Sequence, residues 1–283
     1  MARIAVVTDS TCDMGPEALG RLGTPMVPLK VHFGDETFRD WIDFTPEAYY
    51  PKLVSAVQHP TTSQPSPSEF AEVYAQLADD GATGIVVITI SSKLSGTYES
   101  AVLAARESPV PVRVVDSTFV TGAAALIVEA AVEARDAGGD LEAVEGAALD
   151  AVARTELYFV LDTLDYLVKG GRAGKAQGLA ASLLNIKPVL RVRDGLIEPF
   201  KKVKGTRKAY QEMAAHVAEI SREAGPLKVV LLHAVAPELA ELMADELRSA
   251  GLDGEIVRTD AIGSCIGTHV GPRAVGVAFI RVG

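Results

Sequence analysis

The chain has 283 residues, of which 48% are hydrophobic and 23% are charged, and its formal net charge is −10 at pH 7. This composition excludes a disordered chain and a fibrous repeat, and the acidic balance argues against general nucleic-acid binding. Two cysteines, Cys12 and Cys265, are too few for a disulfide framework or a cysteine-based zinc site. At roughly 150 residues per domain, the length favours two domains.

Three short runs rich in β-branched residues indicate strands in the first half of the chain. They cover residues 4–7, 85–90 and 112–115, and each is followed by a polar turn and a helical pattern. After the second and third runs, apolar residues recur at i, i+3, i+4 and i+7, so each of these helices buries one face. The pattern predicts an N-terminal Rossmann-like α/β domain with a buried parallel sheet, over residues 1–156.

The second half contains a strong hairpin signal. Asp194 and Gly195 stand between two extended runs, a pair that is typical of a tight hairpin turn. We also expect strands at 157–161, 228–233, 254–258 and 275–282, helices at 164–168, 207–223 and 237–250, and a glycine-rich loop at 263–272. These elements predict a C-terminal α/β domain with a mixed or antiparallel sheet, over residues 157–283.

Small hydroxyl residues follow the strands of the predicted parallel sheet, where ligands bind in open α/β folds. Ser95 and Gly96 open a helix, whose free N–H groups suit a carboxylate or a phosphate. Helix capping is the alternative role for Ser95. His269, in the expected glycine-rich loop, is suited to donate a hydrogen bond near neutral pH. The sequence thus indicates an anion site at this edge of the sheet.

Three other kinds of chemistry have weaker support in the sequence than this anion site. The segment from Gly170 to Lys175 has three residues between its glycines instead of the four of a phosphate-binding loop, which argues against ATP binding by that motif. The five histidines lie far apart, so no metal site is expected. A serine hydrolase with Ser95, His269 and Asp116 stays open as an alternative, although no Gly-x-Ser-x-Gly motif occurs.

Positive charge is concentrated in one segment of this acidic chain. Residues 169–208 contain eleven Lys and Arg residues against only Asp194 and Glu198, a local charge of +9. Such a patch attracts an anionic ligand or an acidic partner, or is simply a solvated surface.

The N-terminus reaches Asp9 too early for a signal peptide, and no apolar run approaches the ~18 residues of a membrane span. We expect a cytoplasmic protein.

Seven ordered segments together resemble the DegV family of bacterial fatty-acid-binding proteins. They are Ile4–Thr11, Thr62–Ser66, Ile90–Tyr98, Val114–Ser117, Leu164–Arg172, Leu184–Pro188 and His269–Pro272. The resemblance implies two α/β domains that enclose one long-chain fatty acid, such as palmitate or oleate, in a tunnel between them. It also implies a carrier that is not catalytic alone, needs no cofactor, and makes only transient membrane contact.

The family resemblance also assigns roles to individual residues. Thr62, Ser95, Gly96 and His269 would bind the fatty-acid carboxylate, and Ser63 and Arg172 would lie near the headgroup. The carboxylate would be presented to a separate ATP-dependent kinase subunit, which forms an acyl phosphate for phospholipid synthesis. The basic residues implied as a docking face for that kinase are Arg191, Arg193, Lys201, Lys202, Lys204 and Arg207. A lipid-sensing regulatory module that binds another protein through this face is a second alternative.

Overall fold

The computed structural model describes residues 3–182 and 187–282, with side chains described outside 179–186. The helices are η1 (Ser10–Cys12), α1 (Gly15–Arg21), α2 (Pro46–Ser55), α3 (Pro67–Asp79), α4 (Thr97–Ala105), α5 (Thr121–Asp136), α6 (Leu141–Arg154), α7 (Asp165–Lys169), η2 (Gly174–Ser182), α8 (Thr206–Ala224), α9 (Pro237–Ser249) and α10 (Ser264–Val270). The segment of the family resemblance at residues 184–186 lies outside the described residues.

A four-stranded parallel sheet forms the core of the first half, as the β-branched runs predict. Its order is β2-β1-β6-β7. The strands are β1 (Ile4–Asp9), β2 (Met26–Val27), β6 (Gly84–Thr89) and β7 (Val112–Asp116). Successive side chains of β1 point to opposite faces, so Val6 packs toward α5 and α6 while Val7 packs toward α3 and α4. Both faces are therefore buried, which explains why the strands read as continuous apolar runs.

A six-stranded mixed sheet forms the second half, as expected. Its order is β10-β9-β8-β13-β11-β12, and only β11 and β12 pair in parallel. The strands are β8 (Thr155–Val160), β9 (Lys187–Arg193), β10 (Leu196–Val203), β11 (Leu227–His233), β12 (Gly254–Ala261) and β13 (Val275–Arg281). The predicted hairpin turn is confirmed, because Asp194 and Gly195 both adopt positive φ between β9 and β10.

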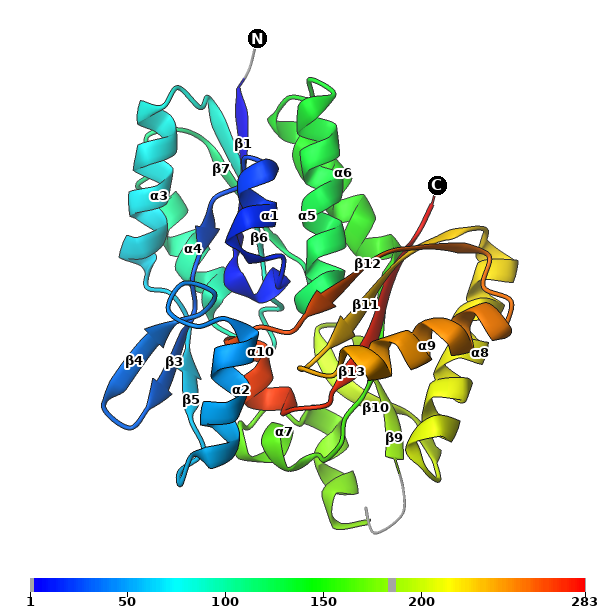
Figure 1. The fold of residues 1–283 in the computed structure, drawn as a ribbon. Helices are drawn as coiled ribbons and strands as arrows, with labels where there is room; N and C mark the ends of the chain where they lie inside the picture. Colours follow the sequence, from blue (N-terminus) through cyan, green and yellow to red (C-terminus); the bar gives the residue numbers. More distant parts are fainter. Residues whose placement is uncertain (1–2, 183–186, 283) are drawn as a thin grey trace.

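The layers place α5 between the two large sheets (Figure 1). It packs against β1 and β6 on one side and against β11 and β13 on the other. Gly122 permits the close approach to β11, because a Cβ there would lie 2.9 Å from side-chain atoms of Val230 and Leu232. Helices α8 and α9 cover the opposite face of the six-stranded sheet. The predicted boundary between residues 156 and 157 falls inside β8, and the division into two domains stays a prediction.

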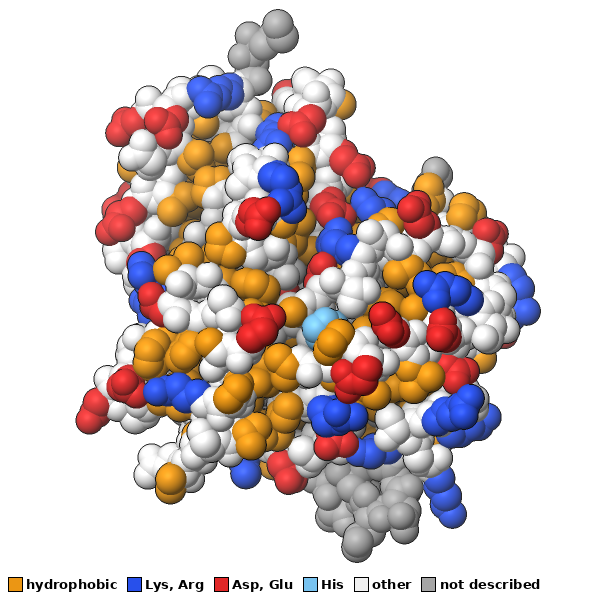
Figure 2. Space-filling model, in the orientation of Figure 1, with side chains coloured by type: hydrophobic (Ala, Val, Ile, Leu, Met, Phe, Trp, Pro, Cys, Tyr) orange, Lys and Arg blue, Asp and Glu red, His pale blue; other side chains and the backbone are white. Residues whose placement is uncertain are grey.

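A third, small sheet was not anticipated. It has the order β4-β3-β5 and is antiparallel. The strands are β3 (Lys30–Phe33), β4 (Glu36–Arg39) and β5 (Thr61–Ser63). Figure 2 shows hydrophobic side chains gathered over this sheet and the neighbouring α2. These strands have only three or four residues each, too few for a recognisable alternation of apolar and polar positions.

Residues 263–272 were expected to form a loop, and this expectation is wrong for most of the segment. Residues 264–270 form helix α10. The sequence gives little sign of a helix here because Gly263, Gly267 and Gly271 interrupt the pattern. Tertiary contacts stabilise the helix instead, since side chains from the first half of the chain bind its first turn.

Candidate ligand-binding site

A cavity of about 350 Å³ lies between the elements of the two halves. Apolar side chains from both halves form most of its wall, and polar side chains gather among the residues from β5, the loop after β6, α10 and the segment after α7. Its apolar lining residues include Leu29, Ile90, Leu94, Val120, Leu157, Phe159, Leu161, Leu167, Val192, Ile197, Leu232, Ile262, Ile266, Val270 and Val275. The volume is in the range of small-molecule sites in proteins.

Five side chains that the sequence singled out line this cavity together: Thr62, Ser63, Ser95, Arg172 and His269. Thr62 Oγ1 lies 2.9 Å from His269 Nε2, and Ser95 Oγ lies 2.9 Å from Thr97 Oγ1. Thr62 is on β5, and His269 is in the last turn of α10. The fold therefore joins residues that lie more than 200 positions apart in the chain.

The pairing of β5 with β3 determines which way Thr62 points. Thr62 pairs with Val31, so its side chain lies on the opposite face of the small sheet from those of Thr61 and Ser63. Thr61 is exposed. Ser63 also borders the cavity, but its Oγ lies 2.8 Å from His32 Nε2. Among the three residues of β5, Thr62 is therefore the one whose hydroxyl contacts His269.

His269 is neutral at physiological pH. Burial, with smaller contributions from the positive charge of Arg172 and from the neighbouring His59, lowers the pKa of its imidazole to about 3. Its ring packs so closely on Gly170 that a Cβ on this glycine would lie 2.2 Å from His269 Nδ1. Gly170 is thus needed for the position of the imidazole, a role that the sequence did not suggest. A neutral imidazole has one N–H, so it can donate one hydrogen bond to an anion.

Arg172 brings a positive charge to the same part of the cavity. Its Nη1 donates to the Gly170 carbonyl oxygen at 2.8 Å, and its Nε donates to the Leu94 carbonyl oxygen at 3.3 Å. Within the described chain, no acidic side chain lies within 4 Å of its guanidinium nitrogens. Among residues 3–182 and 187–282, this charge therefore has no acidic counter-ion, which favours an anionic ligand.

Gly96 lies at the N-cap of α4, as expected for a helix that begins at the site. A Cβ at Gly96 would lie 2.3 Å from Gln64 Oε1, so the glycine leaves room for the Gln64 side chain. Gln64 lines the cavity and donates from Nε2 to Ser100 Oγ at 3.1 Å. Sequence reasoning missed Gln64, because an exposed glutamine after a short strand has no distinguishing pattern.

The hydrogen bonds of Ser95, His269 and Asp116 differ from those of a hydrolase triad. Ser95 pairs with Thr97, His269 pairs with Thr62, and Asp116 Oδ1 accepts from the backbone N–H groups of residues 92 and 118. Among residues 3–182 and 187–282, no cluster of three His, Cys, Asp or Glu side chains suits a metal ion. The arrangement fits binding of an anionic headgroup with an apolar tail.

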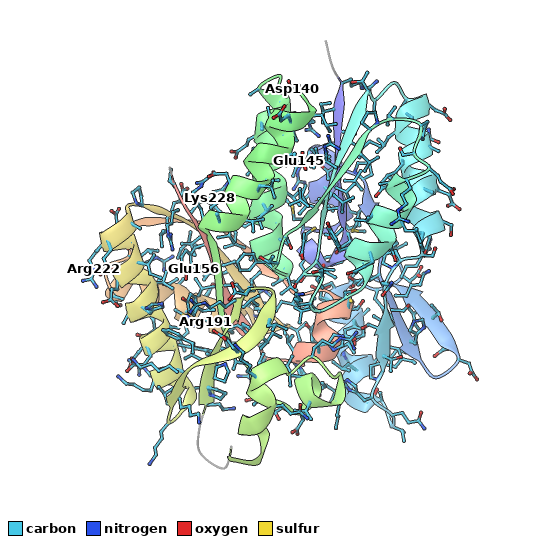
Figure 3. The ribbon with its side chains drawn as sticks, turned by 180° about the vertical axis from the view of Figure 1, so that it is seen from behind. Asp140, Glu145, Glu156, Arg191, Arg222 and Lys228 are labelled. Carbon is cyan, nitrogen blue, oxygen red and sulfur yellow. The ribbon has the colours of Figure 1, made fainter. Side chains whose placement is uncertain are left out.

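The basic segment lies on the β9–β10 hairpin and the start of α8, and acidic side chains neutralise part of it. Figure 3 shows Arg191 on β9 beside Glu156 on β8. Ion pairs link Arg191 to Glu198 at 2.7 Å, Lys201 to Glu212 at 2.5 Å, Arg207 to Glu246 at 3.5 Å and Arg193 to its neighbour Asp194 at 3.9 Å. In the part of the chain that the structure describes, Lys202 and Lys204 are exposed and lack an ion-pair partner within 4 Å.

The fold and the cavity define a class of α/β proteins with a parallel sheet, a mixed sheet and a mostly apolar cavity that residues from both halves of the chain line. The chain belongs to the DegV family, since the model of this family of uncharacterised proteins matches residues 3–282. A DegV domain-containing protein of Streptomyces coelicolor is 40% identical, with 97% of both chains covered. No helix among the described residues is long and apolar enough to cross a membrane.

Solved structures of relatives include fatty-acid-binding proteins. The fatty-acid-binding DegV protein of Thermus thermophilus is 35% identical, with a TM-score of 0.90 and coverage of 99% of this chain and 100% of that chain. A stearic-acid-binding protein of Eubacterium ventriosum is 30% identical, with a TM-score of 0.85 and coverage of 99% and 98%. Fatty-acid binding is thus a property found in this family.

Proposed function

We propose that this protein binds one long-chain fatty acid, with its carboxylate at Thr62, Ser95, the Gly96 amide and His269, and its acyl chain in the cavity. The observation that supports this most directly is the asymmetry of the cavity: its walls are apolar, and its polar side chains include the unpaired cation of Arg172 and the neutral donors of Thr62, Ser95 and His269. Ser63 would lie beside this headgroup region, where its hydroxyl is hydrogen-bonded to His32.

Burial of the acyl chain accounts for most of the expected affinity. A C16 chain such as that of palmitate or oleate gains about 11 kcal/mol of gross transfer free energy at roughly 0.8 kcal/mol per CH2. Few polar contacts are then needed, and they select the carboxylate end and its orientation. The relatives that bind fatty acids support this ligand class.

We also propose that the protein is a carrier without catalytic activity of its own. It would act in the cytoplasm, and its two domains would be residues 1–156 and 157–283.

The proposed site suits a carrier that presents its ligand to a partner. Neutral donors hold the carboxylate without pairing both of its oxygens with cations. One oxygen is then able to attack the terminal phosphorus of ATP on a separate kinase subunit, with loss of ADP, to give an acyl phosphate for phospholipid synthesis. Contact with a membrane would be transient, for loading.

The docking face for the kinase is proposed on the β9–β10 hairpin and the start of α8. Lys202, Lys204 and Arg193 project into solvent, so they are available to an acidic partner. Arg191, Lys201 and Arg207 are held by acidic side chains of this chain, and a partner would have to compete for them.

The test of fatty-acid binding is mass spectrometry of the purified protein under native conditions and after organic extraction. One C14 to C18 acid per chain is expected, and delipidated protein should bind palmitate or oleate in calorimetry, but methyl palmitate much more weakly. A protein that is empty and takes up no fatty acid would overturn the proposal.

The kinase proposal needs a separate experiment. The Lys202→Glu/Lys204→Glu variant should bind fatty acid like the wild type but lose acyl-phosphate formation with the kinase subunit and ATP. The matched control is Lys52→Glu on α2, away from the hairpin. Partner binding without acyl phosphate would instead indicate a lipid-sensing regulatory module.

A further inference from the structure

Two buried carboxyl groups from the first half of the chain hold the first turn of α10. Asp13 Oδ1 accepts hydrogen bonds from the Gly263 N–H and from Trp41 Nε1, both at 3.0 Å. Asp40 Oδ1 accepts from Ser264 Oγ at 2.6 Å and from the Cys265 N–H at 3.1 Å. Asp13 is 2% exposed and Asp40 is fully buried. The two carboxyl groups thus bind consecutive residues of one turn.

The other end of α10 bears the ligand-binding histidine. Thr268 Oγ1 lies 2.6 Å from the Tyr49 hydroxyl, and His269 meets Thr62. Tyr50 on α2 donates from its hydroxyl to the Ile262 carbonyl oxygen at 3.1 Å. Because α10 has only seven residues, a shift of its first turn also moves His269. Asp13 and Asp40 are therefore placed to set the position of the imidazole without touching the ligand.

The two carboxyl groups have more acceptor capacity than they use. In the described part of the chain, Asp13 Oδ2 and Asp40 Oδ2 are buried without a hydrogen-bond partner within 3.5 Å, and neither residue forms a salt bridge. The hydroxyl groups of Thr121 and Ser10 lie near Asp13 and Asp40, respectively, but bring no positive charge. The titratable groups that face them are Asp9 from β1, Cys12 from η1, Tyr49 and Tyr50 from α2, and Cys265 from α10. The positive charge of Arg172 lowers the pKa of Cys265. Among the described residues, no cation contributes to the pKa of Asp13 or of Asp40.

Two uncompensated negative charges in such a place are costly. A proton on one Oδ2 removes one charge and leaves every hydrogen bond to the Oδ1 atoms in place. Burial, and then the negative charge of Asp40, raise the pKa of Asp13 well above its usual range, and burial raises the pKa of Asp40 while the hydrogen bond from Ser264 opposes this.

We propose that Asp13 and Asp40 form a buried acid pair that holds one proton at neutral pH and, through residues 263–265, positions His269 against Thr62. The role in ligand binding rests on the proposed function, but the proton and the position of His269 are properties of the ligand-free protein. Asp13 and Asp40 are positioning residues in this proposal.

The experiment compares delipidated wild type with Asp13→Asn and Asp40→Asn, which keep the Oδ1 acceptor and remove the charge. Asp35→Asn, in the exposed turn between β3 and β4, is the matched control. Urea unfolding from pH 6 to pH 9 should show wild-type stability falling as pH rises, because the folded pair binds a proton that the unfolded carboxyl groups have released. Each single Asn variant should show a weaker dependence, with about one proton fewer taken up on folding, while Asp35→Asn keeps the wild-type slope. The dependence that remains comes from the buried Asp9, Cys12 and Cys265, whose pKa values are also raised.

Imidazole 15N signals of His269 test the positioning. Asp40→Asn should leave these signals near their wild-type positions, whereas Ser264→Ala and Asp40→Ala, which remove bonds to the turn, should shift them and weaken palmitate binding about tenfold. If both Asn variants keep the pH dependence of the wild type, the proposal that the pair holds a proton is overturned. Unshifted His269 signals in Ser264→Ala and Asp40→Ala would overturn the positioning, and the Ser264→Ala result suffices if Asp40→Ala fails to fold. If wild type binds no fatty acid, the proposed function fails while these ligand-free measurements still decide the inference.

Discussion

Thr62 Oγ1 and His269 Nε2 lie 2.9 Å apart, although the two residues are 207 positions apart in the chain. The contact joins the small antiparallel sheet of the first half to a helix that precedes the last strand. It closes the polar end of a cavity whose remaining wall is mostly apolar. The proposed headgroup site therefore depends on the relative positions of two segments that are distant in the chain.

Replacement of Thr62 by valine tests the hydroxyl with little change of shape. The variant loses the hydrogen bond to His269 and one donor to the carboxylate, so palmitate should bind about tenfold more weakly in calorimetry. Thr61→Val is the matched control, because Thr61 lies on the same strand but is exposed. Equal affinity of the two variants would exclude Thr62 from the headgroup site.

Gly170→Ala tests the packing beneath the imidazole. The added Cβ would lie 2.2 Å from His269 Nδ1, so the imidazole has to leave its position beside Gly170, and affinity for palmitate should fall by about tenfold or more. The control is Gly146→Ala in α6, where the described structure places no other atom within 4 Å of the new Cβ. That variant should bind normally and be slightly more stable. Unchanged binding in Gly170→Ala would contradict the role of His269.

Arg172→Gln separates charge from apolar burial. Without the guanidinium, the affinity for palmitate should fall roughly 10- to 100-fold, since hydrogen bonds to charged groups contribute about 1.5–3 kcal/mol. Methyl palmitate has no negative charge, so its weaker binding should hardly change. Arg21→Gln, at an arginine whose side chain is 67% exposed, should leave both affinities as they are. Equal losses for the acid and the ester would mean that Arg172 acts through packing.

Acid should destabilise the protein through His269. Its folded-state pKa of about 3 is below the ordinary value of 6.5, so below about pH 6.5 the unfolded chain binds a proton that the folded chain does not. The free energy of unfolding should therefore fall as the pH is lowered from about 6.5 toward 3, by up to about 1.4 kcal/mol per pH unit from this residue.

His269→Gln removes this contribution, which urea unfolding at pH 7, 6, 5 and 4 would measure. The difference in unfolding free energy between wild type and variant should shrink steadily as the pH falls. His32→Gln is the control, because His32 lies on the small sheet and is not among the residues that line the cavity. A constant difference for His269→Gln would show that the imidazole is accessible to protons in the folded state.

Much of the fold could be predicted locally. The β-branched runs, the helical spacing and the Asp194-Gly195 turn correspond to strands, helices and a hairpin that the structure contains. These signals depend on residues near one another in the chain, so they are legible without tertiary information. The short strands β3 to β5 and helix α10 were missed, because contacts with distant segments stabilise them and their own residues favour them weakly.

The site shows the same division. Thr62, Ser63, Ser95, Gly96, Arg172 and His269 were predicted from motifs. The structure brings all of them except Gly96 to one cavity, and Gly96 lies at the start of α4. Gln64 and Gly170 were not identified, since their roles consist of close contacts with Gly96 and His269 that no spacing rule describes. The burial of Asp13 and Asp40 was equally invisible, because aspartate is ordinarily exposed and only the packing of α10 encloses these two.

The sequence by itself determined the α/β class, the mixed character of the second sheet, and the hydroxyl, glycine and histidine residues suited to an anion. Those properties follow from backbone preferences and side-chain chemistry, which each residue brings with it. Only the tertiary structure decided that Thr62 meets His269, that the imidazole is neutral, that Arg172 lacks an acidic partner among the described residues, and that the walls around them are apolar. Distance, burial and the local electric field belong to the packed chain, because each arises from residues that are brought together only when the two halves fold against one another.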